Sequence, residues 1–172
     1  MTILYVLVAI IAVYFSLVFV VLRLIVPFMG FGRFTMPQRI PQNIQDAIKE
    51  LEATSQNPKE YLRAAYNLVV SKWHAARFAT VLHVSSAFRT DLDTLWNSPG
   101  FAHCHTQNYI LFVLLAGSKY FKELDVKPKV VFFNFFIHQY LQVKVENQII
   151  NVDPAGASIR GKPLGEHIKW FG

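Results

Sequence analysis

Three residues of this chain could together perform thiol chemistry: the only cysteine, Cys104, followed by His138 and Asp153. A cysteine nucleophile, a histidine base and a carboxylate that orients the base are the parts of a thiol catalytic triad. A lone cysteine cannot form a disulfide within the chain, so it is a buried thiol, a metal ligand or a nucleophile. The presence of the other two residues makes the nucleophile our leading hypothesis.

The sequence places Cys104 at the start of a helix. The loop signal Asn-Ser-Pro-Gly at 97–100 precedes it, and the run 107–121 is apolar on nearly all sides, as in a buried central helix. The positive end of a helix dipole lowers the pKa of a thiol and so favours the nucleophilic thiolate. Unpaired N–H groups at the same helix start could hold the oxyanion formed when the thiolate attacks an acyl group.

His138 and Asp153 lie on two predicted strands that a turn at 146–147 would connect. A two-residue turn there places Asp153 opposite Tyr140, so that His138 is diagonal to Asp153 on the same face. Diagonal neighbours are about 7–8 Å apart, within reach of an imidazole and a carboxylate. A turn of odd length would put the two side chains on opposite faces. Taken alone, Asp153 is also typical of a turn aspartate before a proline.

These residues resemble a known superfamily. Cys104 at a helix start, His138 opening a strand and the Asn-Val-Asp-Pro-Ala run at 151–155 are similar to the transglutaminase-like superfamily of papain-type enzymes. The resemblance covers residues 100–155. It implies a nucleophile at Cys104, a base at His138 and an orienting carboxylate at Asp153. It also implies a thiol enzyme without a cofactor, acting on a peptide or protein substrate.

The chain departs from the family pattern beside the cysteine and the histidine. Many members have Gly before the cysteine and Trp or Arg-Asp after it, and a His-Ala/Ser-Trp strand. Here His103 and His105 flank the cysteine, and the strand has His-Gln-Tyr. Trp96 or Gln107 could replace the missing indole. We expect the oxyanion site or cleft to include Trp96, His105, Gln107 and Tyr140.

A cysteine between two histidines also raises the possibility of a metal site. Adjacent residues rarely supply all the ligands of a tetrahedral metal, and the sequence has no second Cys/His pair. We therefore expect no metal here. The other interpretation is that His103 and His105 face solvent or shape the cleft.

The N-terminal segment predicts a membrane anchor. Residues 2–22 carry no charge and are long enough to cross a hydrocarbon core. A signal peptide would have a basic start and a small-residue cleavage site. Here no Lys or Arg precedes Arg23, and the residues that follow it are Leu-Ile-Val-Pro-Phe-Met and not Ala-x-Ala. We expect an uncleaved anchor at 1–26 that contacts the bilayer through residues 2–22. Because the basic residues that follow precede the first acid, we expect a single-pass protein with its N-terminus outside and its C-terminal domain in the cytoplasm.

After a linker rich in proline and glycine at 27–41, residues 42–172 form one domain of ordinary size. The pattern predicts α+β: an N-terminal transmembrane helix, a helical subdomain, and a central Cys-bearing helix packed on a small antiparallel sheet. We expect three helices before the cysteine. The first spans 42–54, the second begins at Asn57-Pro58 and runs to about Phe78, and the third spans 91–96. Residues 81–88 are ambiguous between strand and helix. We expect strands at 130–137 (buried on both faces), 138–145 and 148–152.

The net charge of +6 lies after the apolar segment and favours a solvated surface. The sequence has no Lys/Arg block or RNA-binding signature, so we expect no nucleic-acid partner. Our leading prediction is a membrane-anchored thiol hydrolase (cysteine peptidase-like) or transamidase, acting by acyl transfer or amide hydrolysis. One alternative is a catalytically silent transglutaminase-like fold that serves as an anchored peptide- or protein-binding module. A weaker one is a structural membrane protein with a buried cysteine.

Overall fold

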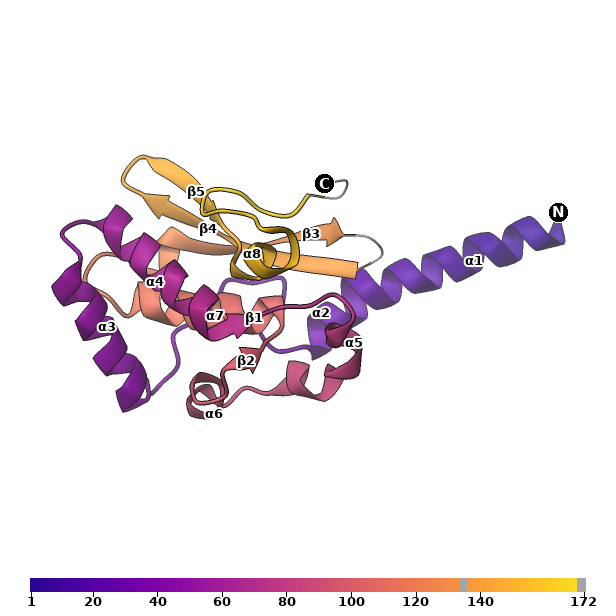
Figure 1. Ribbon diagram of the computed structural model, residues 1–172. Helices are drawn as coiled ribbons and strands as arrows, with labels where there is room; N and C mark the ends of the chain where they lie inside the picture. Colours follow the sequence, from indigo (N-terminus) through magenta and orange to yellow (C-terminus); the bar gives the residue numbers. More distant parts are fainter. Residues whose placement is uncertain (134–135, 170–172) are drawn as a thin grey trace.

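The computed structural model describes residues 1–133 and 136–169 (Figure 1). Helices precede an antiparallel sheet, which confirms the predicted α+β class. Among the described residues one helix is long and apolar enough to cross a membrane, although a signal sequence would have the same properties. It comprises α1 (Thr2–Ser16), the π-helical stretch η1 (Leu17–Val21) and α2 (Leu22–Ile25), and Figure 1 shows α1 projecting from the rest of the molecule.

Two helices follow at the predicted starts. α3 spans Gln42–Thr54, as the spacing of its apolar residues predicts. α4 (Pro58–Lys72) begins after Asn57, whose side-chain oxygen accepts the N–H of Glu60 at 2.9 Å. This N-cap satisfies one of the free donors in the first turn of the helix.

The prediction that α4 continues to about Phe78 is wrong. The chain leaves the helix for a short strand, β1 (Trp73–His74), which pairs in parallel with β2 (Gly100–Phe101). The buried Trp73 side chain donates its indole N–H to the carbonyl of Ser98 at 3.1 Å. This tertiary contact outweighs the local preference for helix and brings the start of the Cys104 loop beside α4.

The ambiguous segment at 81–88 is helical. It contains α5 (Ala79–Leu82) and the 3-10 turn η2 (Val84–Phe88). The next short helix, α6 (Leu92–Trp96), lies within the predicted 91–96, and Asp91 caps it by accepting the N–H of Thr94 at 2.8 Å.

The central helix of the domain is α7 (Cys104–Ala116), which starts with the cysteine as the sequence predicts. Its residues from His105 to Leu115 are all buried, because α3, α4 and the sheet surround it. The helix is shorter than the apolar run. It ends at Ala116, and Gly117 caps it. A Cβ at Gly117 would lie 2.8 Å from the backbone oxygen of Val113 and 2.8 Å from the end of the Ile48 side chain, which favours glycine at this point.

The sheet has three antiparallel strands in the order β3 (Val126–Phe133), β4 (Phe136–Val145) and β5 (Gln148–Val152). The 3-10 turn η3 (Glu123–Asp125) leads into it, and α8 (Pro154–Arg160) follows it. Val145 pairs with Gln148, and Leu141 pairs with Val152. This is the register predicted from a two-residue turn at 146–147, with Glu146 at φ 55°.

The prediction of one strand at 130–137 is wrong. β3 already begins at Val126, and Phe133 pairs with Phe136 at the start of β4, so the apolar run belongs to two paired strands. Residues 134–135 of this run lie outside the described part of the structure. The run is also not buried on both faces, because Val131 and Phe132 are half-buried and Phe136 is exposed.

The segment between the apolar helix and α3 has no regular structure but packs on the domain. The ring of Phe28 stacks on Tyr109 with centroids 3.8 Å apart, and Phe34 meets Phe112 edge-on at 5.3 Å. Phe34 belongs to the same buried cluster as α7. Gln139 donates to the Phe28 carbonyl at 2.8 Å. These contacts attach the segment that follows the apolar helix to the domain.

Candidate active site

Cys104 is the first residue of α7 and is half-buried. His103 occupies the N-cap position, and no N-cap side chain bonds the first-turn N–H groups. The positive end of the helix therefore faces the thiol. This is the position that the loop signal and the following apolar run predict from sequence.

His138, on β4, and Asp153, just after β5, meet as a buried pair. His138 is 3% exposed and Asp153 is 1% exposed. The His138 Nε2 lies 2.9 Å from Asp153 Oδ1 and 2.8 Å from Oδ2. The diagonal placement on one sheet face, predicted from the register, brings the two side chains together. With Nε2 engaged by the carboxylate, Nδ1 is the ring nitrogen left for the hydrogen bond between His138 and the Cys104 thiol.

Two backbone N–H groups hold the Asp153 carboxylate. Gly156 donates to Oδ1 at 2.8 Å and Ile168 donates to Oδ2 at 3.0 Å. The first of these is the N-cap bond of α8, with Pro154 in the first helical turn. Asp153 is thus both a helix-capping residue before a proline and the partner of His138, so the two interpretations of this aspartate are compatible.

The hydrogen bonds perturb both titrating groups. Burial alone raises the pKa of Cys104, but hydrogen bonds with His105 and His138 and the charge of His138 outweigh it and lower the pKa to about 5. Burial alone lowers the pKa of His138, but the hydrogen bond and charge of Asp153, reinforced by the thiolate, raise it to about 10. At a pH between these two pKa values, Cys104 is a thiolate and His138 is an imidazolium, which is the reactive state of a thiol nucleophile.

The two flanking histidines are buried and do not face solvent. His103 Nε2 lies 3.0 Å from the carbonyl of His83, and His105 Nε2 lies 3.1 Å from the carbonyl of Ala87. Their rings stack with centroids 5.4 Å apart. Burial is the main reason that the pKa of His103 is lowered. Both histidines therefore connect the start of α7 to the α5–η2 segment by hydrogen bonds. His105 also makes a hydrogen bond with the Cys104 thiol.

The other three residues expected at the oxyanion site or cleft make contacts with other parts of the domain. Gln107 is fully buried and donates to the Ala102 carbonyl at 2.8 Å, so it braces the loop before the cysteine. Tyr140 stacks on His167 with centroids 4.1 Å apart. Trp96 packs against Trp73, 5.6 Å between centroids. The remaining donors for an oxyanion are the backbone N–H groups at the start of α7, including that of His105.

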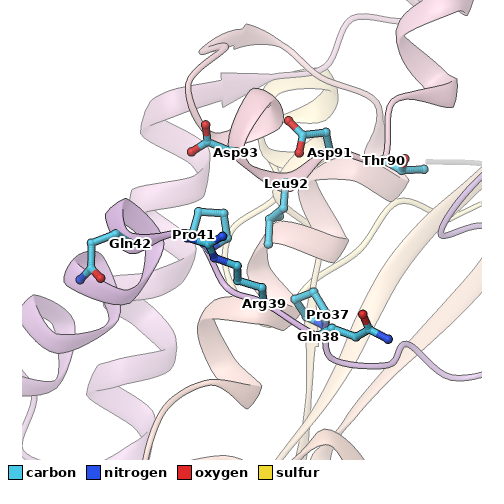
Figure 2. Close-up of a pocket in the computed structure, with 9 residues that line it drawn as sticks. All are labelled: Pro37, Gln38, Arg39, Pro41, Gln42, Thr90, Asp91, Leu92 and Asp93. Carbon is cyan, nitrogen blue, oxygen red and sulfur yellow. The ribbon is translucent and has the colours of Figure 1, made fainter.

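A pocket of about 650 Å³ lies away from these residues (Figure 2). One wall is the segment from Pro37 to Gln42 and the other is Thr90 to Asp93, at the start of α6. None of its lining residues belongs to the Cys104 cluster, and no group there has the paired hydrogen bonds of His138 and Asp153. We therefore place the candidate chemistry at Cys104.

Within residues 1–133 and 136–169, no three His, Cys, Asp or Glu side chains are grouped so as to hold a metal ion. Comparisons of the chain with protein-family models, with curated proteins and with solved structures find no match. The functional argument therefore depends on the geometry of the site itself.

Three contributors to the site were not found from the sequence: the Ile168 N–H, the Gly156 N–H and the Ala87 carbonyl. Each is a backbone group, so its residue type carries no signal. Only Gly156 had a local indication, because a residue three positions after Asp153 is where an N-capping carboxylate finds its donor.

Proposed function

We propose that this protein is a membrane-anchored thiol enzyme of transglutaminase-like type that transfers acyl groups through Cys104, His138 and Asp153. The observation that carries the proposal is the buried pair of His138 and Asp153, with the imidazole Nε2 2.9 Å and 2.8 Å from the carboxylate oxygens and a hydrogen bond between His138 and the Cys104 thiol. The pKa values of about 5 for the thiol and about 10 for the imidazole support a preformed ion pair. Burial of His138 and Asp153 supports a fixed orientation, because neither side chain is solvated.

In the proposed reaction the Cys104 sulfur forms a bond to the carbonyl carbon of an amide or ester. The carbonyl electron pair moves to the oxygen, and N–H groups at the start of α7 stabilise the oxyanion. His138 donates its proton to the leaving amine or alcohol as the carbon–nitrogen or carbon–oxygen bond breaks. Water or an amine then gives a proton to His138 and attacks the thioester, which releases the acyl product and restores the thiolate.

The apolar helix supplies the membrane part of the proposal. Its length and composition suit a span, and Phe15 and Phe19 pack on Phe132 of β3, with ring centroids 5.8 Å and 5.5 Å apart. A helix packed on its own domain is better explained as a retained anchor than as a removed leader. The domain then lies at the bilayer surface, on the side predicted to be cytoplasmic.

The test is acylation of the full chain in detergent by p-nitrophenyl acetate, followed by intact mass and by release of nitrophenol. We expect one acetyl group on Cys104 and continued turnover. His138→Ala should slow acylation by about 10²-fold or more, the usual contribution of a general acid–base group. His74→Ala, an exposed histidine, is the matched control. An acylation rate that does not change in His138→Ala would refute the triad, and acylation without turnover would favour the silent binding module.

A further inference from the structure

The segment between Arg77 and Arg89 exposes large apolar side chains. It forms α5 and η2 and contains no acidic residue. Phe78 and Leu82 are each 82% exposed. These residues, with the exposed Phe136 of β4, are the set that we call the apolar rim: Phe78, Val81, Leu82, Val84, Phe88 and Phe136. Large apolar side chains exposed together on one short segment mark a surface that binds a partner or a membrane.

The apolar rim lies next to Cys104. The carbonyls of His83 and Ala87, inside the α5–η2 segment, contact the two histidines that flank the thiol. On the other side, Phe136 is two residues before His138 on β4. Figure 1 shows α5 at the same end of the domain as α2 and the paired ends of β3 and β4, where α1 leaves the molecule.

The apolar helix sets the depth of this end of the domain in a bilayer. A hydrocarbon core needs about 20 residues of helix, so nearly the whole uncharged run from Thr2 to Leu22 must lie in it. At 1.5 Å per residue, Phe19 is then roughly 5 Å inside the boundary that Leu22 reaches. Because Phe132 contacts Phe19, the end of the β3–β4 pair is at the same depth.

We infer that the apolar rim enters the lipid leaflet from which the helix emerges, so that the Cys104 site opens at the bilayer surface. The inference rests on the anchor in the proposed function and does not depend on the thiol chemistry. Its occupant is the acyl-chain and headgroup region of that leaflet. Lipid is favoured over a second copy or a protein partner because the end of the β3–β4 pair that carries Phe136 also carries Phe132, which contacts the membrane-spanning segment.

Charge at the borders of the apolar rim agrees with a lipid surface. Arg77 and Arg89 stand at its two ends. Arg23, at the end of the apolar helix, donates to the carbonyls of Met29 and Gly30 at 3.2 Å and 3.1 Å, which turns the chain back towards the domain. Basic residues around an apolar face are typical of segments that lie in a membrane interface. The next acidic residue in the chain, Asp91, is engaged in capping α6.

The test measures the depth of nitroxide labels by electron paramagnetic resonance. Cys104→Ser removes the only cysteine, and single cysteines are then introduced at Leu82, Phe136, Val8 and Ile149. Val8 reports on the apolar helix, and Ile149, 68% exposed on β5, reports on an apolar residue remote from the rim. The full chain is placed in vesicles of equimolar phosphatidylcholine and phosphatidylglycerol. Relaxation by oxygen, which concentrates in lipid, is compared with relaxation by a water-soluble nickel chelate.

We expect labels at Leu82 and Phe136 to have an oxygen-to-nickel ratio well above that of Ile149 and below that of Val8, which lies deeper in the bilayer. A high nickel effect at Leu82, equal to that at Ile149, would overturn the inference while leaving the anchor intact. Low relaxation by both reagents would overturn it too, because protein and not lipid would then cover the rim. A water-exposed label at Val8 would remove the anchor and the inference together, and acylation of Cys104 would still be measurable separately.

Discussion

Both carboxylate oxygens of Asp153 contact the same nitrogen of His138, at 2.9 Å and 2.8 Å. The carboxylate therefore fixes the tautomer of the ring and stabilises its protonated form. The opposite ring nitrogen is left for the hydrogen bond between His138 and Cys104. The protonation of the thiol thus depends on a carboxylate that the thiol does not itself contact, and this dependence can be measured.

The first prediction concerns the pH dependence of Cys104 alkylation by iodoacetamide. Because the thiol pKa is lowered to about 5, the thiolate is present at neutral pH and the rate falls as pH decreases through about 5. His138→Ala removes the neighbouring cation, so the midpoint should move up towards the ordinary thiol value of about 8.5. An unshifted midpoint in His138→Ala would mean that the two groups are not coupled.

The second prediction concerns Gly156, which donates its N–H to Asp153. A Cβ at this position would collide with the Asp153 carboxylate. Gly156→Ala should displace the carboxylate, weaken its bond to His138 and raise the thiol pKa by the same alkylation assay. Gly32→Ala is the matched control, because a Cβ there meets nothing within 4 Å. Equal alkylation profiles for the two variants would contradict a positioning role for Asp153.

The third prediction concerns the start of α4. Asn57 accepts the Glu60 N–H at 2.9 Å, and the Glu60 carboxylate accepts the N–H of Gln56 at 2.9 Å. This reciprocal cap indicates that Asn57→Ala lowers the free energy of unfolding by about 1 kcal/mol. Chemical unfolding of the full chain in detergent measures the loss. Asn57→Ser retains an acceptor and puts no second negative charge beside the Glu60 carboxylate, which Asn57 contacts at 2.8 Å, so it should lose less. An equal loss in both variants would contradict the cap.

The parts of the site that could be predicted are those fixed by local patterns. The turn at 146–147 and the alternation around it set the register, and the register puts His138 and Asp153 on one face. The loop before Cys104 and the apolar run after it set the start of α7. These features depend on residues close together in the chain, where turn chemistry and periodicity are informative.

The parts that could not be predicted depend on contacts between distant residues. The Ile168 N–H reaches Asp153 only because the chain after α8 folds back, and β1 exists only because Trp73–His74 pairs with Gly100–Phe101. The pattern at 130–137 predicts one strand because its periodicity does not reveal that Phe133 and Phe136 belong to two paired strands. Long-range pairing of this kind leaves no local pattern in the sequence.

The last prediction concerns the segment expected to be a linker. Phe34 is buried against Phe112 and Tyr109, whereas Phe31, three residues earlier, is exposed beside Arg23. Phe34→Ala should lower the free energy of unfolding by about 3 kcal/mol, because it leaves a cavity in the core around α7. Phe31→Ala should change it by less than about 1 kcal/mol. Chemical unfolding of both variants measures these changes. Similar small losses of unfolding free energy in the two variants would mean that residues 27–41 are a detached linker. A large loss in Phe34→Ala alone would make this segment part of the domain that supports Cys104.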